Sequence, residues 1–318
     1  MTVLSRASIE SVFISIAPYA GSVNVLVTGG SGQLSSYVFE ELAGKHDAWG
    51  VDTRPAVHKS AMGKVEVADI RDTEAMRRAM KGADAVIHTA AQVSVQRSTE
   101  DPAFDADQNV MGTISVLRAT RDSGVKKFIY ISSAAVYGNP LYIPVDEKHP
   151  AAPLSFYGTS KLSAEAYTRA FGSSFGMKGT VVRPFNFYSS RADPSSPYSG
   201  VITKFTERAK SGEALRIEGE GDQTRDFLHA SDVARMLRLI LESNVDGLTL
   251  NCGSGAGTTI SELAETVKRI APGEVRIEHV APRTADIKHS VAEVSLAEKE
   301  LGFRTRVTLE DGLRTFFQ

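Results

Sequence analysis

The sequence predicts an α/β fold, with a doubly wound parallel sheet followed by a smaller C-terminal α/β lobe. Between about residues 24 and 183, short apolar segments typical of buried strands alternate with segments of helical periodicity. Such alternation gives parallel strands with helices on both faces of the sheet. Beyond residue 183 the chain becomes richer in Pro, Ser and Gly, as in the segment 191–200, which indicates a loop region that opens a second lobe. A chain of 318 residues is long enough for both parts.

The first elements are a strand, a glycine turn and a helix. Residues 24–28 are typical of a buried strand, and Gly29-Gly-Ser-Gly32 follows them directly. Three apolar residues then recur at helical spacing before Gly44: Leu34, Val38 and Leu42. In such a unit the backbone N–H groups at the start of the helix face a pyrophosphate. The pattern therefore predicts a phosphate-binding turn, although a glycine pattern on its own is a weak signal.

The second strand, 48–52, ends in an acid, Asp52, about 20 residues after the glycine turn. An acid at this distance typically holds the 2′-hydroxyl of a ribose. Because a carboxylate repels a 2′-phosphate, Asp52 favours NAD over NADP, and Arg54 nearby weakens this preference only slightly.

The later segments continue the alternation of strand and helix. We expect strands at 65–69, 84–88, 127–132 and 179–183, and helices at 73–80 and 157–171. Another helix, ending near Gly124, is expected to turn one apolar stripe toward the core: Ala106, Val110, Ile114 and Leu117.

Tyr157 and Lys161 are four residues apart, so one helical turn places the phenol and the ammonium on the same face. A phenol with a pKa near 10 is a poor base at neutral pH. A cation about 4 Å away in a partly screened site contributes roughly 4 kcal/mol, or about three pKa units of acidification, which suits general acid/base exchange. A surface Tyr and Lys that merely share a turn would give the same spacing. This pair, however, follows a glycine turn and a strand that ends in Ser132-Ser133.

These features, taken with several other motifs, resemble the extended short-chain dehydrogenases/reductases, the NAD-dependent epimerase/dehydratase family. Within that family the chain is most similar to the UDP-glucose (UDP-galactose) 4-epimerases, from about residue 24 to the C-terminus. The matching motifs are Thr28-Gly-Gly-Ser-Gly32, Asp69-Ile70, His88-Thr-Ala-Ala91, Asn109, Ser133-Ala-Ala-Val-Tyr-Gly138, Tyr157 with Lys161, Arg183-Pro-Phe-Asn186, Arg225-Asp-Phe227 and Arg283.

The resemblance implies a Rossmann-type domain that binds NAD, formed by residues 23–185 and about 229–255. It implies a nucleotide-sugar-binding lobe formed by residues 186–228 and 256–318. Residues 1–22 have no counterpart in the family, and we expect them to be a disordered extension. The residues implied to bind the cofactor are Gly29, Gly32, Gln33, Leu34, Asp52, Asp69, Ile70, Thr89, Ala90, Ala91, Asn109, Tyr157 and Lys161.

The resemblance also implies the chemistry. Tyr157 exchanges the proton of a sugar hydroxyl that NAD oxidises, Lys161 lowers the pKa of the phenol and holds the nicotinamide ribose, and Ser133 orients the reacting oxygen. We therefore expect a UDP-hexose 4-epimerase that works through a transient 4-keto intermediate. Dehydratases of the family carry an Asp-Glu type pair directly after the Ser or Thr. Here Ala134 and Ala135 stand in those places, and a methyl group cannot transfer a proton.

Substrate contacts are implied at four positions. Asn186, Arg225 and Arg283 match positions that contact the nucleotide diphosphate, for which the planar fork of Arg is well suited. Ser290 matches a position where a bulky aromatic side chain excludes N-acetylated sugars in some relatives. We therefore expect UDP-N-acetylhexosamines to fit as well as UDP-glucose.

The chain departs from the family pattern at two places. Ser35 replaces the third glycine, which lets helix and strand approach closely, and this puts the affinity for NAD in question. Tyr188-Ser-Ser190 replaces the usual Tyr-Gly-Pro, so this substrate-side loop is expected to differ.

Two other functions stay open from the sequence. One is an NAD(P)-dependent nucleotide-sugar reductase or dehydratase of the same superfamily; a reductase would consume external reduced cofactor. The other is a non-catalytic dinucleotide-binding sensor, although such proteins usually lack a pair like Tyr157 and Lys161.

Composition restricts the partners. A net charge of −2 gives no reason to expect nucleic acid or an anionic membrane, and no stretch is long and apolar enough to span a bilayer. The single cysteine, Cys252, fits a reducing compartment, so we expect a cytoplasmic protein. The seven histidines show no metal-ligand spacing, so no metal is expected, and His88 and His229 are expected to be structural. The resemblance implies a homodimer.

Overall fold

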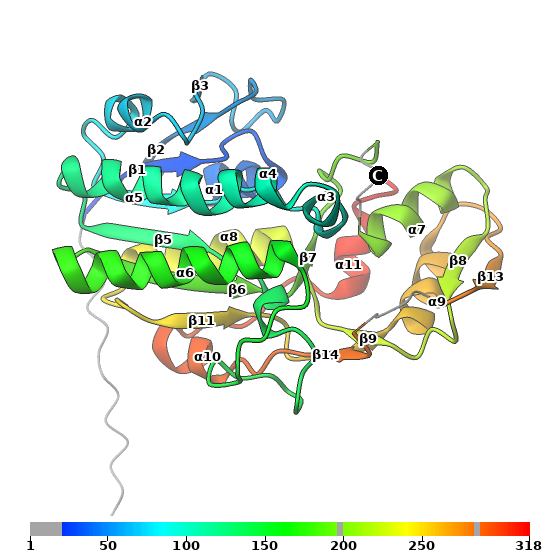
Figure 1. The fold of residues 1–318 in the computed structure, drawn as a ribbon. Helices are drawn as coiled ribbons and strands as arrows, with labels where there is room; N and C mark the ends of the chain where they lie inside the picture. The colour runs from blue at the N-terminus through cyan, green and yellow to red at the C-terminus, as the bar shows by residue number, and fades with distance from the viewer. Residues whose placement is uncertain (1–20, 196–199, 283–286) are drawn as a thin grey trace, which may run out of the picture.

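The fold was obtained as a computed structural model that describes residues 21–195, 200–282 and 287–318. Figure 1 shows a large domain built on a central sheet and a smaller lobe beside it. The predicted α/β class is confirmed. The prediction of a disordered extension at residues 1–22 falls almost wholly outside the described residues.

The large domain contains seven parallel strands in the order β11-β6-β5-β4-β1-β2-β3. Consecutive strands therefore grow outward from β1 in both directions, which is the doubly wound topology that the sequence predicts. The strands are β1 (Asn24–Thr28), β2 (Asp47–Asp52), β3 (Val65–Val67), β4 (Ala85–His88), β5 (Lys127–Ile131), β6 (Lys178–Pro184) and β11 (Thr249–Cys252).

Both faces of this sheet are covered by helices, so its strands are apolar on both sides. In β1, Val25 and Val27 point into one hydrophobic cluster and Leu26 into another. The first cluster is closed by α1 (Gln33–Leu42), α8 (Ala230–Glu242) and α10 (Ser295–Leu301). The second is closed by α2 (Thr73–Ala79), α5 (Gly112–Asp122) and α6 (Phe156–Phe175).

The helix expected around residues 106–124 is interrupted. Helices α3 (Val95–Glu100) and α4 (Pro102–Ala106) lead into a π-helical turn, Asp107–Met111, before α5 begins. The wider turn changes which residues face inward. Ala106 is exposed and Val110 and Ile114 are only half-buried. The expected core stripe is therefore wrong except at Leu117; the inward residues are Asn109, Gly112, Thr113, Val116 and Leu117.

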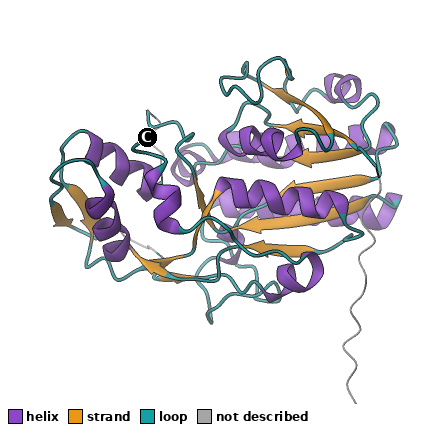
Figure 2. Ribbon diagram, turned by 180° about the vertical axis from the view of Figure 1, so that it is seen from behind, coloured by secondary structure: helices purple, strands orange, loops and turns teal. Residues whose placement is uncertain are grey.

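The small lobe is built from short strands and helices (Figure 2). Its strands are β7 (Asn186–Tyr188) beside β10 (Phe227–His229), β9 (Thr224–Arg225) between β12 (Thr258–Thr259) and β14 (His289–Ser290), and β8 (Leu215–Glu218) beside β13 (Ile277–Val280). Its helices are α7 (Val201–Lys210), α9 (Ile260–Ile270) and α11 (Leu309–Arg314). They enclose a separate hydrophobic cluster that includes Phe205, Leu263 and Leu313.

One C-terminal segment differs from the predicted division into domains. Ala297 and Leu301 of α10, and Phe303 after it, belong to the hydrophobic cluster of the large domain. Figure 1 places α10 beside β11, at the edge of the large sheet. The segment around 295–303 therefore packs with the large domain, although it was assigned to the lobe. An apolar helical stripe alone does not say which core it joins.

Candidate active site

The glycine turn between β1 and α1 packs closely against the loop that follows β4. Gly29 has a φ of +70°, and a Cβ atom there would lie 2.8 Å from the backbone N of Ala90. Gly32 caps α1 without a side-chain hydrogen bond, and the first turn of α1 carries no acid. Unpaired N–H groups at the start of this ten-residue helix therefore suit a pyrophosphate. The turn fits the dinucleotide that the sequence predicts.

Ser35, which replaces a family glycine, is accommodated. Its side chain is fully buried, and its hydroxyl lies 2.9 Å from the hydroxyl of Thr89. The Thr89 hydroxyl in turn donates to the carbonyl of Thr28 over 2.7 Å. The substitution thus adds a polar link between α1, β1 and the loop after β4, and the Ser35 hydroxyl has a partner in Thr89.

The two acids predicted to bind the cofactor behave differently. Asp52 lies beside the glycine turn, where its carboxylate accepts from the backbone N–H groups of Ser31 and Arg54, each over 3.1 Å. Asp69 is paired with Arg71, whose hydrogen bonds hold the pKa of that carboxyl below its usual value. Ile70 is buried, and Gly112 approaches it so closely that a Cβ there would lie 2.5 Å from its Cδ1.

His88, at the end of β4, is structural, as expected. It is fully buried between two hydroxyls, with Nδ1 2.6 Å from Thr28 Oγ1 and Nε2 3.0 Å from Thr113 Oγ1. Burial, together with the charge of Lys161, lowers the pKa of His88 to about 3. It is therefore a neutral hydrogen-bonding group at neutral pH.

Asn109, in the π-helical turn, holds the loop that follows Ala91. Its side-chain oxygen accepts from the backbone N of Gln92 over 2.8 Å, and its amide donates to the carbonyl of Gln92 over 2.9 Å. The same amide reaches Ser160 of α6 over 3.0 Å. The predicted cofactor loop, Thr89 to Ala91, is therefore fixed to α6 through Asn109.

Tyr157 and Ser133 come together at the start of α6. Gly158 permits the close approach, because a Cβ there would lie 2.6 Å from the carbonyl oxygen of Ala135, in the short 3-10 turn after Ser133. Burial raises the pKa of the Tyr157 phenol to about 12, a side-chain hydrogen bond with Ser133 lowers it, and the charge of Asp105 raises it.

The predicted acidification of Tyr157 by Lys161 is wrong in this structure. The Lys161 ammonium lies over the ring of Tyr130, 4.5 Å from its centroid. Lys161 is almost fully buried, and burial lowers its own pKa to about 7, although Glu165 and Asp105 raise it. The four-residue spacing places both residues on one face of the helix, but burial is the largest influence on the pKa of each, and the charge of Lys161 is not among the causes that shift the pKa of Tyr157.

Glu165 continues the same face of α6 one turn after Lys161 and is fully buried. Its carboxylate accepts from Arg183 Nε over 2.9 Å and Nη2 over 2.7 Å, and from the Ser132 hydroxyl over 2.5 Å. Arg183 belongs to β6, and Ser132 precedes Ser133. The ion pair of Glu165 and Arg183, together with the hydrogen bond to Ser132, therefore joins α6 to β6 and to the strand end that precedes Ser133.

Three of the predicted substrate residues are gathered by strand pairing in the small lobe. Asn186 of β7 pairs with Phe227 of β10, and Ser290 of β14 pairs with Arg225 of β9. Asn186 is exposed, while Arg225 and Ser290 are half-buried. The fourth, Arg283, lies outside the described residues.

The altered loop after Tyr188 contacts the glycine-turn helix. The buried Ser189 hydroxyl donates to the side-chain oxygen of Gln33 over 2.9 Å. Arg191 lies over the ring of Tyr37 and donates to Glu40 over 2.6 Å. Ser189, which stands where the family has Gly, thus connects the substrate side of the site to a predicted cofactor residue.

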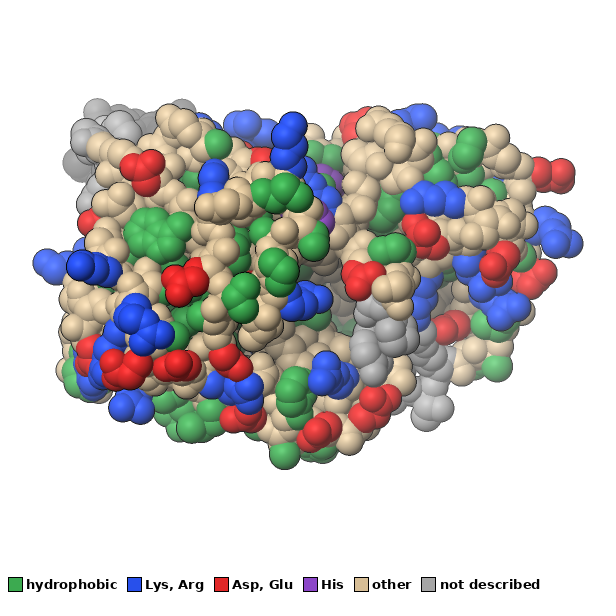
Figure 3. Space-filling model, turned by 90° about the horizontal axis from the view of Figure 1, so that it is seen from above, with side chains coloured by type: hydrophobic (Ala, Val, Ile, Leu, Met, Phe, Trp, Pro, Cys, Tyr) green, Lys and Arg blue, Asp and Glu red, His purple; other side chains and the backbone are tan. Residues whose placement is uncertain are grey.

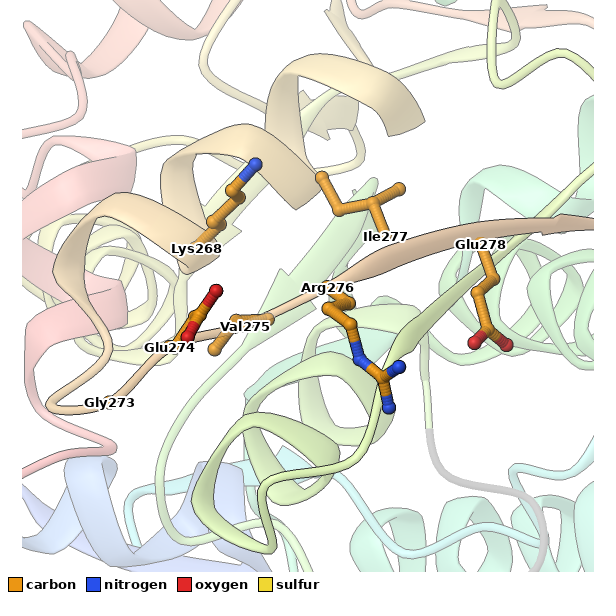
Figure 4. A pocket seen from close by; sticks show the side chains of 7 residues that line it. All are labelled: Lys268, Gly273, Glu274, Val275, Arg276, Ile277 and Glu278. Atoms are coloured by element: carbon orange, nitrogen blue, oxygen red, sulfur yellow. The ribbon is translucent and has the colours of Figure 1, made fainter.

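The surface between the two lobes is hollowed, and histidine, lysine and arginine side chains lie along the hollow (Figure 3). A second hollow of about 490 Å³ lies on the small lobe, beside β13 (Figure 4). Its charged lining comes from Lys268, Glu274, Arg276 and Glu278. It contains no predicted site residue, so it is not the candidate active site.

The described part of the chain holds no group of three or more His, Cys, Asp or Glu residues placed to bind a metal ion. Within the same residues, no helix is both long and apolar enough to cross a membrane.

The family described as the NAD dependent epimerase/dehydratase family matches residues 25–253. The chain belongs to this family. It is 30% identical to a UDP-glucose 4-epimerase of Mycolicibacterium smegmatis, over 92% of this chain and 96% of that protein. The resemblance drawn from the sequence is confirmed.

Two solved epimerase structures share this fold. A UDP-glucose 4-epimerase with UDP-glucose from Thermotoga maritima is 34% identical and has a TM-score of 0.84, covering 92% of this chain and 96% of that one. A UDP-glucose-4-epimerase from Stenotrophomonas maltophila, with bound NAD and formylated UDP-arabinopyranose, is 30% identical. Its TM-score is 0.86, over 93% of this chain and 97% of that one.

In this member of the epimerase/dehydratase family, sequence reasoning missed two buried acids beside Lys161. Glu165 had a usable signal, since it extends the four-residue spacing of Tyr157 and Lys161 by one more step. Asp105 stands four residues before Asn109, but the π-helical turn that brings the two together leaves no periodic pattern.

Proposed function

We propose that this chain is an NAD-dependent nucleotide-sugar 4-epimerase that interconverts UDP-glucose and UDP-galactose. The observation that supports the proposal is the hydrogen bond between Tyr157 and Ser133 at the start of α6, with the buried Lys161 one turn further along the same helix. The names of the relatives described above support the same reaction.

NAD, when bound, accepts a hydride from the sugar carbon and gives it back, and its positively charged ring lowers the pKa of a phenol that faces it. We infer that the glycine turn receives its pyrophosphate and that Asp52 receives the adenosine ribose. Lys161, buried one helical turn after Tyr157, would hold the ribose on the reacting side.

The side chains of the protein transfer one proton, that of the sugar 4-hydroxyl. Tyr157 takes the proton from the sugar 4-hydroxyl, and Ser133, already hydrogen-bonded to the phenol, holds the same oxygen. The 4-keto sugar then turns in the site and presents its other face. The hydride returns to C4 on that face and Tyr157 returns the proton to the oxygen, which leaves the 4-hydroxyl inverted.

The loss of water from a sugar needs an acid and a base. This chain has neither at the positions where the family's dehydratases carry them. Ala134 and Ala135 form the 3-10 turn directly after Ser133, and both are half-buried. Neither side chain transfers a proton, so the loss of water from the sugar has no support from this turn. Reversible oxidation at one carbon is the reaction that the residues present serve.

The function is tested by incubating purified protein with UDP-glucose and no added cofactor. We expect UDP-galactose to form, because the cofactor is restored in each cycle. A requirement for added reduced cofactor would indicate a reductase instead. Inertness toward every nucleotide sugar would indicate a non-catalytic dinucleotide-binding protein.

Ser290 is proposed to set the size of the sugar that fits. Its small side chain, beside Arg225 in the strand register, leaves room for an N-acetyl group. We expect the wild type to act on UDP-GlcNAc, and Ser290→Tyr to lower kcat/KM for UDP-GlcNAc about 10- to 100-fold while retaining UDP-glucose. The matched control is Ser211→Tyr, at the exposed end of α7. A wild type active on UDP-glucose but not on UDP-GlcNAc would contradict the assignment.

We also propose a cytoplasmic homodimer. Helices α5 and α6 lie side by side on one face in Figure 1. This part of the surface leaves Met111, Tyr167 and Phe175 exposed, although all three are large and apolar. Sedimentation at the mass of a single chain would count against the dimer.

A further inference from the structure

A cluster of buried polar side chains lies between the cofactor loop and α6. Its members are Gln92, Ser94, Asp105, Asn109 and Ser160, each at most 9% exposed. Asp105 Oδ1 accepts from Gln92 Nε2 over 2.8 Å and from Asn109 Nδ2 over 3.1 Å. The other oxygen, Oδ2, is buried and has no hydrogen-bond partner in the described part of the chain.

An ionised carboxylate with an unpaired oxygen is costly to bury. The contrast with Glu165 is direct, since Arg183 neutralises that acid with two hydrogen bonds. Among the described residues, no Lys or Arg forms such a pair with Asp105. Asp105 therefore has no directly paired cation among the described residues, and it acts on a neighbouring buried group across a longer distance.

Lys161 is that group. Its ammonium is almost fully buried, and the ring of Tyr130 lies below it. Burial lowers the pKa of Lys161, whereas the charges of Glu165 and Asp105 raise it. The titratable groups that act on Lys161 or contact it come from four elements: Glu165 on α6, Asp105 on α4, Tyr130 on β5 and His88 on β4.

We propose that Asp105 is a positioning residue for the acid/base pair of the proposed epimerase. One carboxylate oxygen holds Gln92 and Asn109, and through Asn109 and Ser160 it fixes the turn of α6 between Tyr157 and Lys161. The buried negative charge keeps Lys161 an ammonium. Asp105 does not touch the reacting atoms; it acts through Lys161.

Asp105→Asn separates the charge from the geometry. The amide oxygen can still accept from Gln92 and Asn109, but the negative charge is gone. The pKa of Lys161 is then expected to fall by on the order of one unit, a tenfold loss in the ratio of ammonium to amine. The alkaline limb of the kcat profile, where Lys161 loses its proton, is expected to move to lower pH by the same amount.

Lys161 is followed directly, by NMR of the NAD-bound protein with lysine labelled at Cε, and Lys161→Arg assigns its signal. Gln92→Leu removes the hydrogen bond to Asp105 and the two to the backbone of Ser94 but keeps the Asp105 carboxylate, so it is expected to lower kcat without moving the Lys161 midpoint. Asp122→Asn, at the C-terminal end of α5, is the matched control. It is expected to change neither kcat nor the pH midpoint of Lys161.

If Asp105→Asn folds and its Lys161 titrates at the same pH as in the wild type, the proposal is overturned, even if kcat falls. If that variant does not fold, the proposal is tested by the pH midpoint of Lys161 in the wild type. A midpoint near pH 7 or above supports the proposal, and one below pH 6 overturns it. The titration needs no turnover, so a protein inactive with every nucleotide sugar would refute the proposed function without ending this test.

Discussion

Tyr157→Phe is expected to lower kcat for UDP-glucose about 10²- to 10⁴-fold while the protein keeps its NAD. The change removes one oxygen, the atom that hydrogen-bonds Ser133 and exchanges the sugar proton. The ring, which packs at the start of α6, is retained, so the fold and the cofactor site are not disturbed. The measurements are UDP-galactose formation and the NAD released when the protein is denatured.

The same helix supplies a control for this change. Tyr167→Phe removes the same atom from an exposed residue ten positions along α6. This variant is expected to match the wild type in kcat and in NAD content. Near-normal turnover by Tyr157→Phe would refute its role as the acid/base.

Glu165→Ala is expected to lower the free energy of unfolding by about 3–5 kcal/mol, because it leaves the Arg183 charge buried without a partner. Urea denaturation at pH 7 measures the loss. Glu265→Ala removes an acid that is two-thirds exposed and pairs only loosely with Lys268, and its urea midpoint should stay near that of the wild type. A similarly small effect of Glu165→Ala would mean that the pair does not join α6 to β6.

The same pair gives the stability a dependence on pH. Burial would raise the pKa of Glu165, but the hydrogen bond and the charge of Arg183 hold it below its ordinary value of 4.5. As the pH falls, the unfolded chain therefore takes up this proton before the folded one does. The contribution of Glu165 is complete above about pH 4.5 and is lost as the pH falls through the lower folded value. Thermal unfolding of the wild type should show this loss, and Glu165→Ala should lack it.

Local patterns supplied most of the residues proposed for the site. The glycine turn, Asp52 and the pair of Tyr157 and Lys161 depend on spacing within one strand-turn-helix unit, so the sequence displays them. Burial is different, because it depends on what packs around a side chain. That is why Lys161 was expected to acidify Tyr157, whereas the loss of water around both groups prevails in the folded chain.

The other incorrect predictions, of the core stripe and of the domain to which α10 belongs, also failed because packing is not visible in local sequence patterns. The π-helical turn at 107–111 adds no sequence signal, yet it turns Asn109 inward and leaves Ala106 exposed. Likewise, the apolar stripe of α10 predicted a helix but not its position, and this segment packs on the large sheet. Contacts between segments far apart in the chain decided both cases.

Tyr157, Lys161 and Glu165 share one stripe of α6, and this limits how such a protein can be altered. A helix turns by roughly 100° per residue, so inserting or deleting a single residue between positions 157 and 165 would separate the proton donor from the residue that fastens the helix to β6. Such a variant would lose both catalysis and the folded structure. New substrate preferences are better sought in the loops and short strands of the small lobe, where length can change without rotating this stripe.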